Sequence, residues 1–301
     1  MTLRIAEWFG HYSTARDSRA KKDRAEEKCP FIETTCTKTF NDGSISGVCS
    51  VTDGKGRAVA ICPNRLYARG HAFLGEIAAV AFGGTPEILH PRDVAGARHD
   101  GTKVVAFGKN FGSELKLPKR GGRGSYFVDW ILARIGPEGV LAEFVAVEVQ
   151  TIDTTGSYRP QVQGLRRGDE VLSESKAGLN WENVNKRILP QLIYKGHVLR
   201  RERLCTKGLF FVCPGPVYRR IQERLGGGLL RYENLQPGSI VFRWYDLQAT
   251  QGGAYNLVFS DQFPTTVDQV ATAFTSPTNL PEAGVYEEAI RSAIERYGTR
   301  S

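Results

Sequence analysis

The stretch "EFVAVEVQTIDTTGSY", residues 143–158, is an almost unbroken apolar run with a carboxylate in its middle. Its composition favours a β-strand, in which side chains alternate between two faces. Glu148 and Gln150 would then share one face. Ala146 and Ile152 would join them there, and the other face would carry Val145, Val147, Val149 and Thr151. A carboxylate in so apolar a strand is costly unless it is paired or binds a metal, so Glu148 is a candidate site residue.

The chain around this strand mixes strand patterns with helix patterns. The segment "SYFVDWILARI", residues 125–135, predicts a strand that the turn "GPEG" would join to residues 143–153 as a hairpin. Further strands are expected over residues 102–110, 208–214, 239–247 and 254–260, and helices over residues 71–82, 92–99, 180–204, 216–225 and 282–298. Pro190 would kink the 180–204 helix or end its first half. We therefore expect an α/β fold with a mixed α+β sheet.

The composition is that of an ordinary globular protein. The chain has 301 residues, of which 41% are hydrophobic and 24% are charged. No apolar run is long enough to span a membrane, and the charged N-terminus lacks the apolar core of a signal peptide, so we expect a cytoplasmic protein with no membrane partner. The net charge of +8 suits a polyanionic partner such as nucleic acid, although many basic proteins bind none.

Four of the six cysteines lie near the N-terminus, at Cys29, Cys36, Cys49 and Cys62. Clustered cysteines in a cytosolic protein indicate metal binding more often than disulfides. The spacings C-x6-C, C-x12-C and C-x12-C lack the C-x2-C knuckles of a zinc ribbon, but four thiolates on separate loops could close one structural site for zinc or a single iron. The alternative is four buried free thiols, and the spacing leaves both possibilities open.

Acidic residues near Glu148 suggest a second kind of metal site. Asp129 lies on the preceding strand, and Glu114 lies fifteen residues before Asp129. Two carboxylates that face the same way on adjacent strands could bind Mg²⁺, which activates water for phosphodiester cleavage. Gln150 could orient that water, but it is neutral and cannot stabilise anionic charge as a lysine would. The pattern is weak by itself, because buried carboxylates can equally pair with arginine.

Several motifs, in the same order, resemble those of the NotI-type restriction endonucleases, a family of the PD-(D/E)xK superfamily that cuts GC-rich DNA palindromes. The most specific of them is "VEVQTIDTTGSY", residues 147–158. The others are "EWFGH", "CPF", "ETTC", "GVC", "CPNR", "GSEL", "VDW" and "NVNKRILPQLIYK". The resemblance covers most of residues 6–195, and the C-terminal third matches less clearly.

The resemblance implies a fold and two metal sites. It implies an N-terminal arm with a four-cysteine metal-binding module over residues 1–70, followed by a PD-(D/E)xK catalytic and DNA-binding core over residues 71–301. Family members bind one iron through four cysteines, which here would be Cys29, Cys36, Cys49 and Cys62, with zinc as the other candidate metal. The implied catalytic residues are Glu114, Asp129, Glu148 and Gln150, with Asp129 and Glu148 binding Mg²⁺. Gln150 stands where the superfamily usually has lysine.

The resemblance also implies an activity and its partners. It implies a bacterial type II restriction endonuclease that makes double-strand breaks with 5′-phosphate and 3′-hydroxyl ends. The compact chain favours the hexamer CGGCCG over the octamer that longer members of the family recognise. A palindromic target implies a two-fold homodimer. A cognate DNA methyltransferase would act on the same site without needing to bind the nuclease.

Basic and amide side chains beyond the catalytic strand are candidates for DNA contact. Arginine and lysine read guanine, while acceptors read cytosine N4. The candidate base readers are Arg159, Gln161, Gln163, Arg166 and Arg167, and the candidate phosphate contacts are Lys186, Arg187, Lys195 and the loop "KRGGRG" at residues 119–124. Any one of them could instead belong to a solvated basic face.

Three other functions are alternatives. A structure-specific repair nuclease of the same superfamily would cut branched or damaged DNA and ignore an intact palindrome. A non-catalytic, metal-stabilised DNA-binding protein would use Asp129 and Glu148 in salt bridges only. A rubredoxin-like electron carrier is disfavoured, because most of the chain would have no purpose in it.

Overall fold

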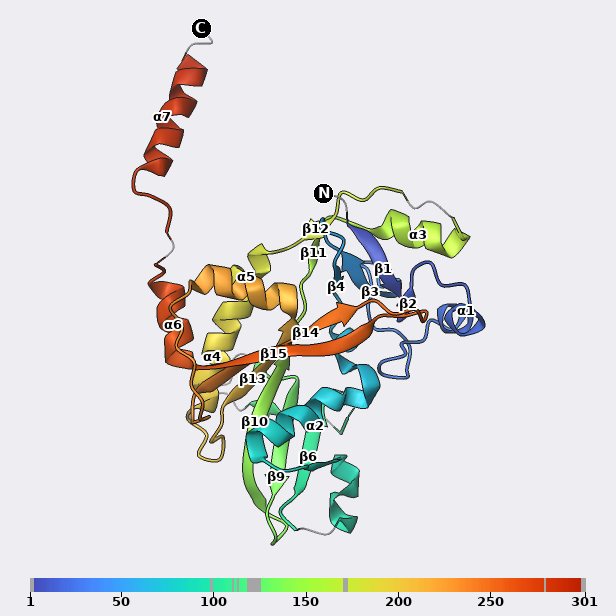
Figure 1. The fold of residues 1–301 in the computed structure, drawn as a ribbon, viewed down its shortest axis with the longest axis vertical. Helices are drawn as coiled ribbons and strands as arrows, with labels where there is room; N and C mark the ends of the chain where they lie inside the picture. The colour runs from blue at the N-terminus through green and yellow to red at the C-terminus, as the bar shows by residue number, and fades with distance from the viewer. Residues whose placement is uncertain are drawn as a thin grey trace.

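The computed structural model describes residues 3–97, 100–109, 111–112, 114–117, 126–169, 173–278 and 280–298. Its centre is a seven-stranded sheet with the strand order β15-β14-β13-β10-β9-β6-β5 (Figure 1). The strand β10 (Leu141–Val149) pairs antiparallel with β9 (Trp130–Ile135), as the hairpin pattern predicts, and parallel with β13 (Leu209–Pro214). The predicted α/β class with a mixed sheet is confirmed.

The other elements surround this sheet. Its remaining strands are β5 (Glu87–Leu89), β6 (Lys103–Gly108), β14 (Ser239–Gln248) and β15 (Asn256–Thr266). A second sheet of order β2-β1-β3-β4 contains β1 (Arg4–Trp8), β2 (His11–Tyr12), β3 (Val48–Thr52) and β4 (Ala58–Ala60). The short paired strands are β7 (Lys116–Leu117) with β8 (Tyr126–Phe127), and β11 (Thr154–Thr155) with β12 (Gly178–Leu179). The helices are α1 (Ser18–Ala25), η1 (Pro63–Tyr67), α2 (Ala68–Phe82), η2 (Pro91–Gly96), α3 (Arg159–Arg167), η3 (Val184–Ile188), α4 (Leu189–Leu199), α5 (Gly215–Leu225), α6 (Val267–Thr275) and α7 (Val285–Gly298).

The two faces of β10 pack into two different apolar clusters. Val145, Val147 and Val149 lie in the cluster that contains the buried side chains of α2. Ala146 and Ile152 lie in the cluster that contains the buried apolar side chains of α4. The alternation predicted for this strand is confirmed up to Val149, where β10 ends, so Gln150, Thr151 and Ile152 lie beyond the strand and not within it as expected.

Some helices differ from the sequence pattern. The 180–204 pattern divides near Pro190 into the π-helical turn η3 and the α-helix α4, whose first turn contains the proline. This division follows from the missing N–H of proline, which is tolerated at a helix start and not in its interior. The sequence pattern did not predict α3 or α6. The nine-residue α3 contains Pro160 in its first turn and Gly164 in its interior, and these two residue types usually mark a turn or a loop in a sequence.

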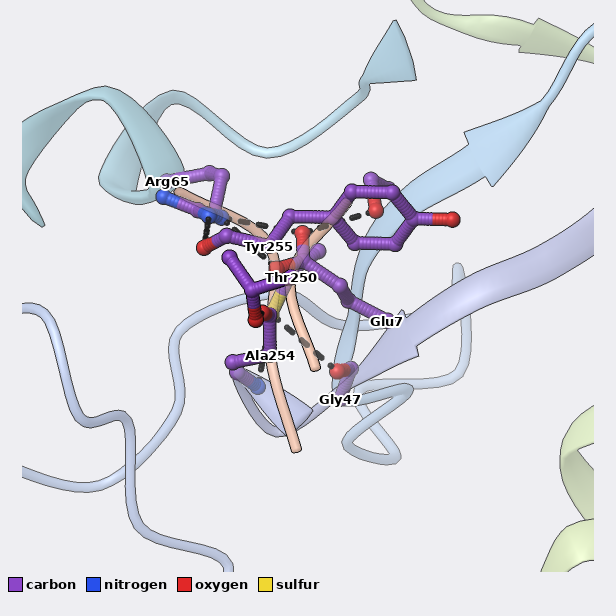
Figure 2. A network of polar contacts seen from close by, with 9 residues as sticks. Glu7, Gly47, Arg65, Thr250, Ala254 and Tyr255 are labelled. Carbon is purple, nitrogen blue, oxygen red and sulfur yellow. Dashed lines mark hydrogen bonds and ion pairs between the residues drawn. The ribbon is translucent and has the colours of Figure 1, made fainter. Parts of the chain in front are cut away.

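A buried ion pair joins the N-terminal sheet to the C-terminal hairpin (Figure 2). Arg65 on η1 donates from Nε to the Glu7 carboxylate on β1 at 2.9 Å, and the two side chains are 2% and 0% exposed. Arg65 also donates from Nη2 to the carbonyl of Tyr255 at 2.7 Å, while the Ser50 hydroxyl donates to Glu7 at 2.7 Å. A buried pair is stable only when its remaining donors and acceptors are satisfied in this way. The network therefore fixes β1, β3, η1 and the β14–β15 loop together.

The N-terminal region and the main sheet share one core. A single apolar cluster contains Phe9 from the N-terminal sheet region and Phe211 from β13. The division of the chain into residues 1–70 and 71–301 therefore stays a prediction. The helix α7 lies apart from the rest of the chain (Figure 1). Within the described ranges, no helix is long and apolar enough to cross a membrane.

Candidate functional site

A polar cavity of about 330 Å³ opens at the C-terminal end of β10. Three of the four predicted catalytic residues line it, namely Glu114, Asp129 and Gln150. The fourth, Glu148, is buried beside Asp129 and is not itself a lining residue. The antiparallel pairing of β9 with β10 explains this arrangement, because it brings the residue before β9 next to the end of β10. The structure thus brings together residues that the sequence separates widely.

The carboxylate of Asp129 is anchored through one oxygen. Its Oδ2 accepts a hydrogen bond from the backbone N–H of Val149 at 2.7 Å. Burial raises the pKa of Asp129, and the charge of Glu114 acts in the same direction, while the Val149 N–H and the charge of Lys195 act against it. A buried carboxylate with a raised pKa is poised to bind a cation, because a metal relieves the cost of its charge.

Glu148 is also held through one oxygen. Its Oε1 accepts from the ammonium of Lys195 at 2.5 Å, and its Oε2 is buried with no hydrogen-bond partner in the described part of the chain. Burial raises the pKa of Glu148 to about 7, with a further contribution from the nearby charge of Asp129. The pairing with Lys195 explains how an apolar strand tolerates this carboxylate, and it leaves one carboxylate oxygen unused.

These two carboxylates fit a hard divalent cation chemically. Each keeps one oxygen in a protein contact, and the orphaned Oε2 of Glu148 is an acceptor that lacks a donor. Among the described residues, no three His, Cys, Asp or Glu side chains are close enough to form a complete metal site. Two carboxylates with water and substrate oxygens suffice for Mg²⁺, which rarely has an all-protein cage.

The other two predicted catalytic residues are less fixed. Gln150 is half-buried, and its Nε2 donates to the carbonyl of Thr151 at 3.4 Å, a long hydrogen bond. That contact uses the amide nitrogen and not the amide oxygen Oε1, which is the atom that could accept a hydrogen bond from a water molecule. Glu114 is exposed at the cavity wall. Its charge acts on Asp129, but among the described residues it makes no ready-made ligand set with the two buried carboxylates.

The four N-terminal cysteines are buried, unpaired thiols. Burial raises the pKa of all four, to about 11 for Cys62. The charge of Cys29 acts on each of the other three, so these thiols lie near one another. In contrast, no other thiol of the described chain acts on Cys205 or Cys213. The donor types fit a metal, yet in the described residues no three of these thiols approach closely enough to form a site.

The cysteine region also contributes to the wall of the cavity. Lys38 and Asn64, each two residues after a cysteine, line the cavity beside Thr37. The N–H of Lys38 faces the sulfur of Cys36, and the N–H of Asn64 faces that of Cys62, which stabilises both thiolates. Asn64 Nδ2 donates to Thr37 Oγ1 at 3.0 Å, and Lys38 Nζ donates to the Ile61 carbonyl at 3.0 Å. The positions of the cysteines therefore determine part of the cavity wall.

Most of the predicted DNA-contacting residues lie at the surface. Gln163 is exposed on α3. Four of the basic candidates form exposed ion pairs, namely Arg159 with Asp42, Arg166 with Glu27, Arg167 with Asp169 and Lys186 with Glu182. Arg187 lines the cavity and lies 3.7 Å from Asp153. Exposed pairs of this kind are weak, so a phosphate can replace the carboxylate partner.

Two of the candidates are buried instead. Gln161 is 1% exposed, accepts from the N–H of Ile5 at 3.2 Å and donates to the Leu3 carbonyl at 2.9 Å. Its amide is already used in joining α3 to the N-terminal strand, so a structural role replaces the expected base contact. Lys195 is 9% exposed and pairs with Glu148, which makes a surface phosphate contact unsuitable for it. The loop at residues 119–124 lies outside the described residues.

The sequence pattern missed several residues of the cavity wall. They are Thr37, Lys38, Asn64, Tyr67, Lys109 and Asp153. The motifs "CTK" and "CPN" were the available signal for Thr37, Lys38 and Asn64, because these polar residues follow a cysteine within two positions. Nothing in the sequence pattern pointed to Tyr67, whose pKa is raised by burial of its phenol and by the charges of Asp129, Cys62 and Glu148.

Comparison with known proteins identifies the family of the chain. The family model described as restriction endonuclease NotI matches residues 14–257. The matched range includes the four N-terminal cysteines, Asp129 and Glu148, and it ends before α6. No curated protein matches the chain.

Proposed function

Because the chain belongs to the NotI restriction endonuclease family, we propose that it makes Mg²⁺-dependent double-strand breaks at a short GC-rich palindrome, with CGGCCG as the favoured target. The family establishes the general activity, which is that of a site-specific deoxyribonuclease acting on double-stranded DNA. The observation that carries the finer proposal is the pair Asp129 and Glu148. Each is a buried carboxylate with one oxygen held by the protein; Asp129 lines the polar cavity, and Glu148 is buried beside it.

The proposed reaction is the hydrolysis of one phosphodiester bond in each strand. Mg²⁺ would be held by Asp129 and Glu148, and when bound it would neutralise phosphate charge and lower the pKa of a water molecule. Gln150 would orient the attacking water through its amide oxygen. The new bond joins the oxygen of the water molecule to phosphorus, the bond from phosphorus to the 3′ oxygen breaks, and the leaving 3′ oxygen takes up a proton. The products are therefore 5′-phosphate and 3′-hydroxyl ends. Glu114, at the cavity wall, would act on the same centre through its charge on Asp129.

Recognition of a palindrome requires two copies of the site. We propose a two-fold homodimer in which each active site cuts one strand. Arg159 and Gln163 are the proposed base readers, since both side chains are at the surface close to the end of the catalytic strand. Lys186 and Arg187 are proposed phosphate contacts, and Arg187 is supported by its place in the cavity wall. A cognate methyltransferase would modify the same palindrome in a bacterial cytoplasm.

The N-terminal cysteines are proposed to bind one structural metal ion, iron or zinc, through Cys29, Cys36, Cys49 and Cys62. Their mutual electrostatic interaction supports this proposal, and the described thiols elsewhere in the chain lack it. The bound metal would cross-link loops of residues 29–63, which have few regular elements of their own. This module and a PD-(D/E)xK core over residues 71–301 are the proposed domains.

Mapping of the cut ends tests the proposed function. The purified chain is incubated with phage DNA of known sequence in Mg²⁺, and both ends of every fragment are sequenced after adaptor ligation. The proposal expects a single GC-rich palindrome at all cut ends, and ligation that needs no prior 5′ phosphorylation. Cutting at branched substrates with no shared sequence would instead support a repair nuclease. An absence of cutting by folded, metal-loaded protein would contradict the proposed reaction.

A further inference from the structure

The proposed active site lacks a positive charge on its catalytic strand. Gln150 is neutral, so β10 provides no cation beside Asp129 and Glu148. Other elements provide cations: Lys109 lines the cavity and acts on Asp129 through its charge, and Lys195 forms a hydrogen bond with Glu148. The ammonium of Lys195 on α4 lies 2.5 Å from Glu148 Oε1, and its charge also acts on Asp129. We propose that Lys195 is the catalytic lysine of this enzyme, which delivers from α4 the positive charge that position 150 does not carry; this inference rests on the proposed function.

The surroundings of Lys195 hold its charge in place. On α4 it follows Leu192 by three residues and precedes Leu199 by four, so all three lie on the buried face of the helix. A lysine on a buried face is unfavourable unless it is paired, which ties the ammonium to the Glu148 carboxylate. The neighbouring Gly196 packs closely against Val267, since a Cβ at this glycine would be only 2.9 Å from that side chain. The close packing leaves α4 little freedom to move the lysine away.

A purely structural ion pair explains only part of this geometry. It accounts for Glu148 Oε1 but leaves Oε2 buried without a partner among the described residues. With Lys195 on Oε1, the free oxygen Oε2 of Glu148 would hold a metal, and two further N–H donors of the ammonium would be available to a water molecule or a phosphate oxygen. In this role Lys195 acts through its charge and transfers no proton. It stabilises the negative charge that develops on the phosphate.

Neutral substitutions of Lys195 test the proposal in single-turnover cleavage with saturating enzyme. Lys195→Met and Lys195→Gln are expected to slow cleavage by at least about 100-fold, the usual effect of losing one charge-stabilising donor. Duplex binding in Ca²⁺ should stay within about threefold of wild type, since the loss is confined to the reaction step. The control is Lys207→Met, because Lys207 also pairs with a carboxylate of β10, Glu143 at the other end of the strand, in a longer and more exposed pair of 3.5 Å. That variant should cleave normally.

A lysine introduced at position 150 distinguishes a catalytic role of the Lys195 charge from a purely structural one. In the Lys195→Met background, Gln150→Lys returns a cation to the cavity from β10, and it should recover at least about tenfold of the lost rate. Cleavage by a folded Lys195→Gln at the wild-type rate would overturn the proposal, and so would a double variant no faster than Lys195→Met. If the wild type itself does not cut in Mg²⁺, or if Asp129→Asn still cuts, it is the proposed function that fails instead.

A separate feature is a basic cleft of about 650 Å³ between α1 and α3. The charged residues described at its wall are Arg16, Lys21, Arg24, Arg166, Arg167 and one carboxylate, Glu27. Arg24 is fixed by hydrogen bonds to the carbonyls of Tyr12 and Ala15, and its guanidinium lies 4.9 Å from the ring centre of Trp8. Burial and the nearby charge of Arg16 lower the pKa of Arg24, so the fold holds like charges together at this place.

An anion in this cleft would relieve that repulsion. We infer that the cleft between α1 and α3 binds the phosphate backbone of the DNA substrate. A cleft with five cations and one carboxylate suits a polyanion, and the enzyme has such a substrate. In this cleft Arg166 and Arg167 would position the DNA through its phosphates and would not read bases. The helix α1 would then also belong to the DNA-contacting surface. It goes beyond the proposed target, because phosphate contacts do not depend on sequence.

Two adjacent lysines on α1 provide a matched test. Lys21 lines the cleft, whereas Lys22 lies near Glu26 and does not line it. Binding of two duplexes, one with and one without CGGCCG, is measured in Ca²⁺ over a range of salt concentrations. Lys21→Ala should weaken binding to both alike and reduce the slope of log K against log salt by about 1. Lys22→Ala should change neither. An unchanged slope for Lys21→Ala, or a loss on the CGGCCG duplex alone, would overturn the inference, and this readout needs no cleavage.

Discussion

Replacing Asp129 with asparagine should stabilise the metal-free protein at alkaline pH while it abolishes cleavage. Burial raises the pKa of Asp129 and Glu148, and the charge of Asp129 adds to the effect on Glu148. For Glu148 the increase from 4.5 to about 7 corresponds to a cost of roughly 3 kcal/mol to the ionised native state. Asparagine removes the charge at position 129 and keeps an oxygen that can accept from the Val149 N–H.

The sign of this effect depends on pH. Because the native pKa values are raised, the cost is absent below about pH 4.5 and grows as the pH rises to about 7. Desolvation is the larger cause for Glu148 and persists in the variant, so we assign about 1–2 kcal/mol of the cost to the Asp129 charge. That gain corresponds to an increase in Tm of about 2–5 °C at pH 8, and to less than about 1 °C at pH 5.

Thermal unfolding in EDTA at both pH values, followed by titration with Ca²⁺, measures these effects. Ca²⁺ should raise the Tm of the wild type by binding the native carboxylates, and it should leave Asp129→Asn unchanged. The control is Asp268→Asn, which removes an exposed carboxylate paired with Arg200 and should not raise Tm at either pH. Lower stability of Asp129→Asn than of the wild type at pH 8, or equal stabilisation of both proteins by Ca²⁺, would contradict the repulsion between Asp129 and Glu148.

Four further outcomes are expected. Single-turnover cleavage at limiting Mg²⁺ should rise about tenfold per pH unit up to about pH 7, because Glu148 must lose its proton to bind metal; a flat profile would contradict this. Cys36→Ser should lose the bound metal in elemental analysis, whereas Cys205→Ser, also a buried thiol, should keep it; equal metal content in both would exclude the four-cysteine site. Gln161→Ala should lower the free energy of unfolding by about 1–3 kcal/mol in denaturant titration and leave sequence preference unchanged. Arg65→Met should lower it by about 3–5 kcal/mol, since it leaves a buried carboxylate unpaired; a loss below about 1 kcal/mol would argue against the network in Figure 2.

The sequence could predict the catalytic strand because its signal is local. The alternation of β10 has a period of two, and its two faces indeed enter different clusters. The hairpin with β9 also follows from one short turn. These two local features together put Asp129 and Glu148 side by side, so this part of the candidate site follows from the order of the residues alone.

The remainder depends on contacts between distant residues. Lys195 is 47 residues from Glu148, and only the path of α4 across the sheet shows that they meet. Gln161 is 158 residues from Leu3, and its type alone suggested a polar surface contact. Tertiary packing decides whether a polar residue is buried or exposed, and a single sequence does not specify that packing.

A digest of a plasmid with one CGGCCG site by the wild type and by Asp129→Asn, each with Mg²⁺ and with EDTA, tests the proposed reaction most directly. The wild type is expected to linearise the plasmid at that site in Mg²⁺ only, and the variant is expected to bind the DNA without cutting it. Cutting by Asp129→Asn, or equal cutting by the wild type in EDTA, would contradict a reaction that depends on these two carboxylates and a divalent cation.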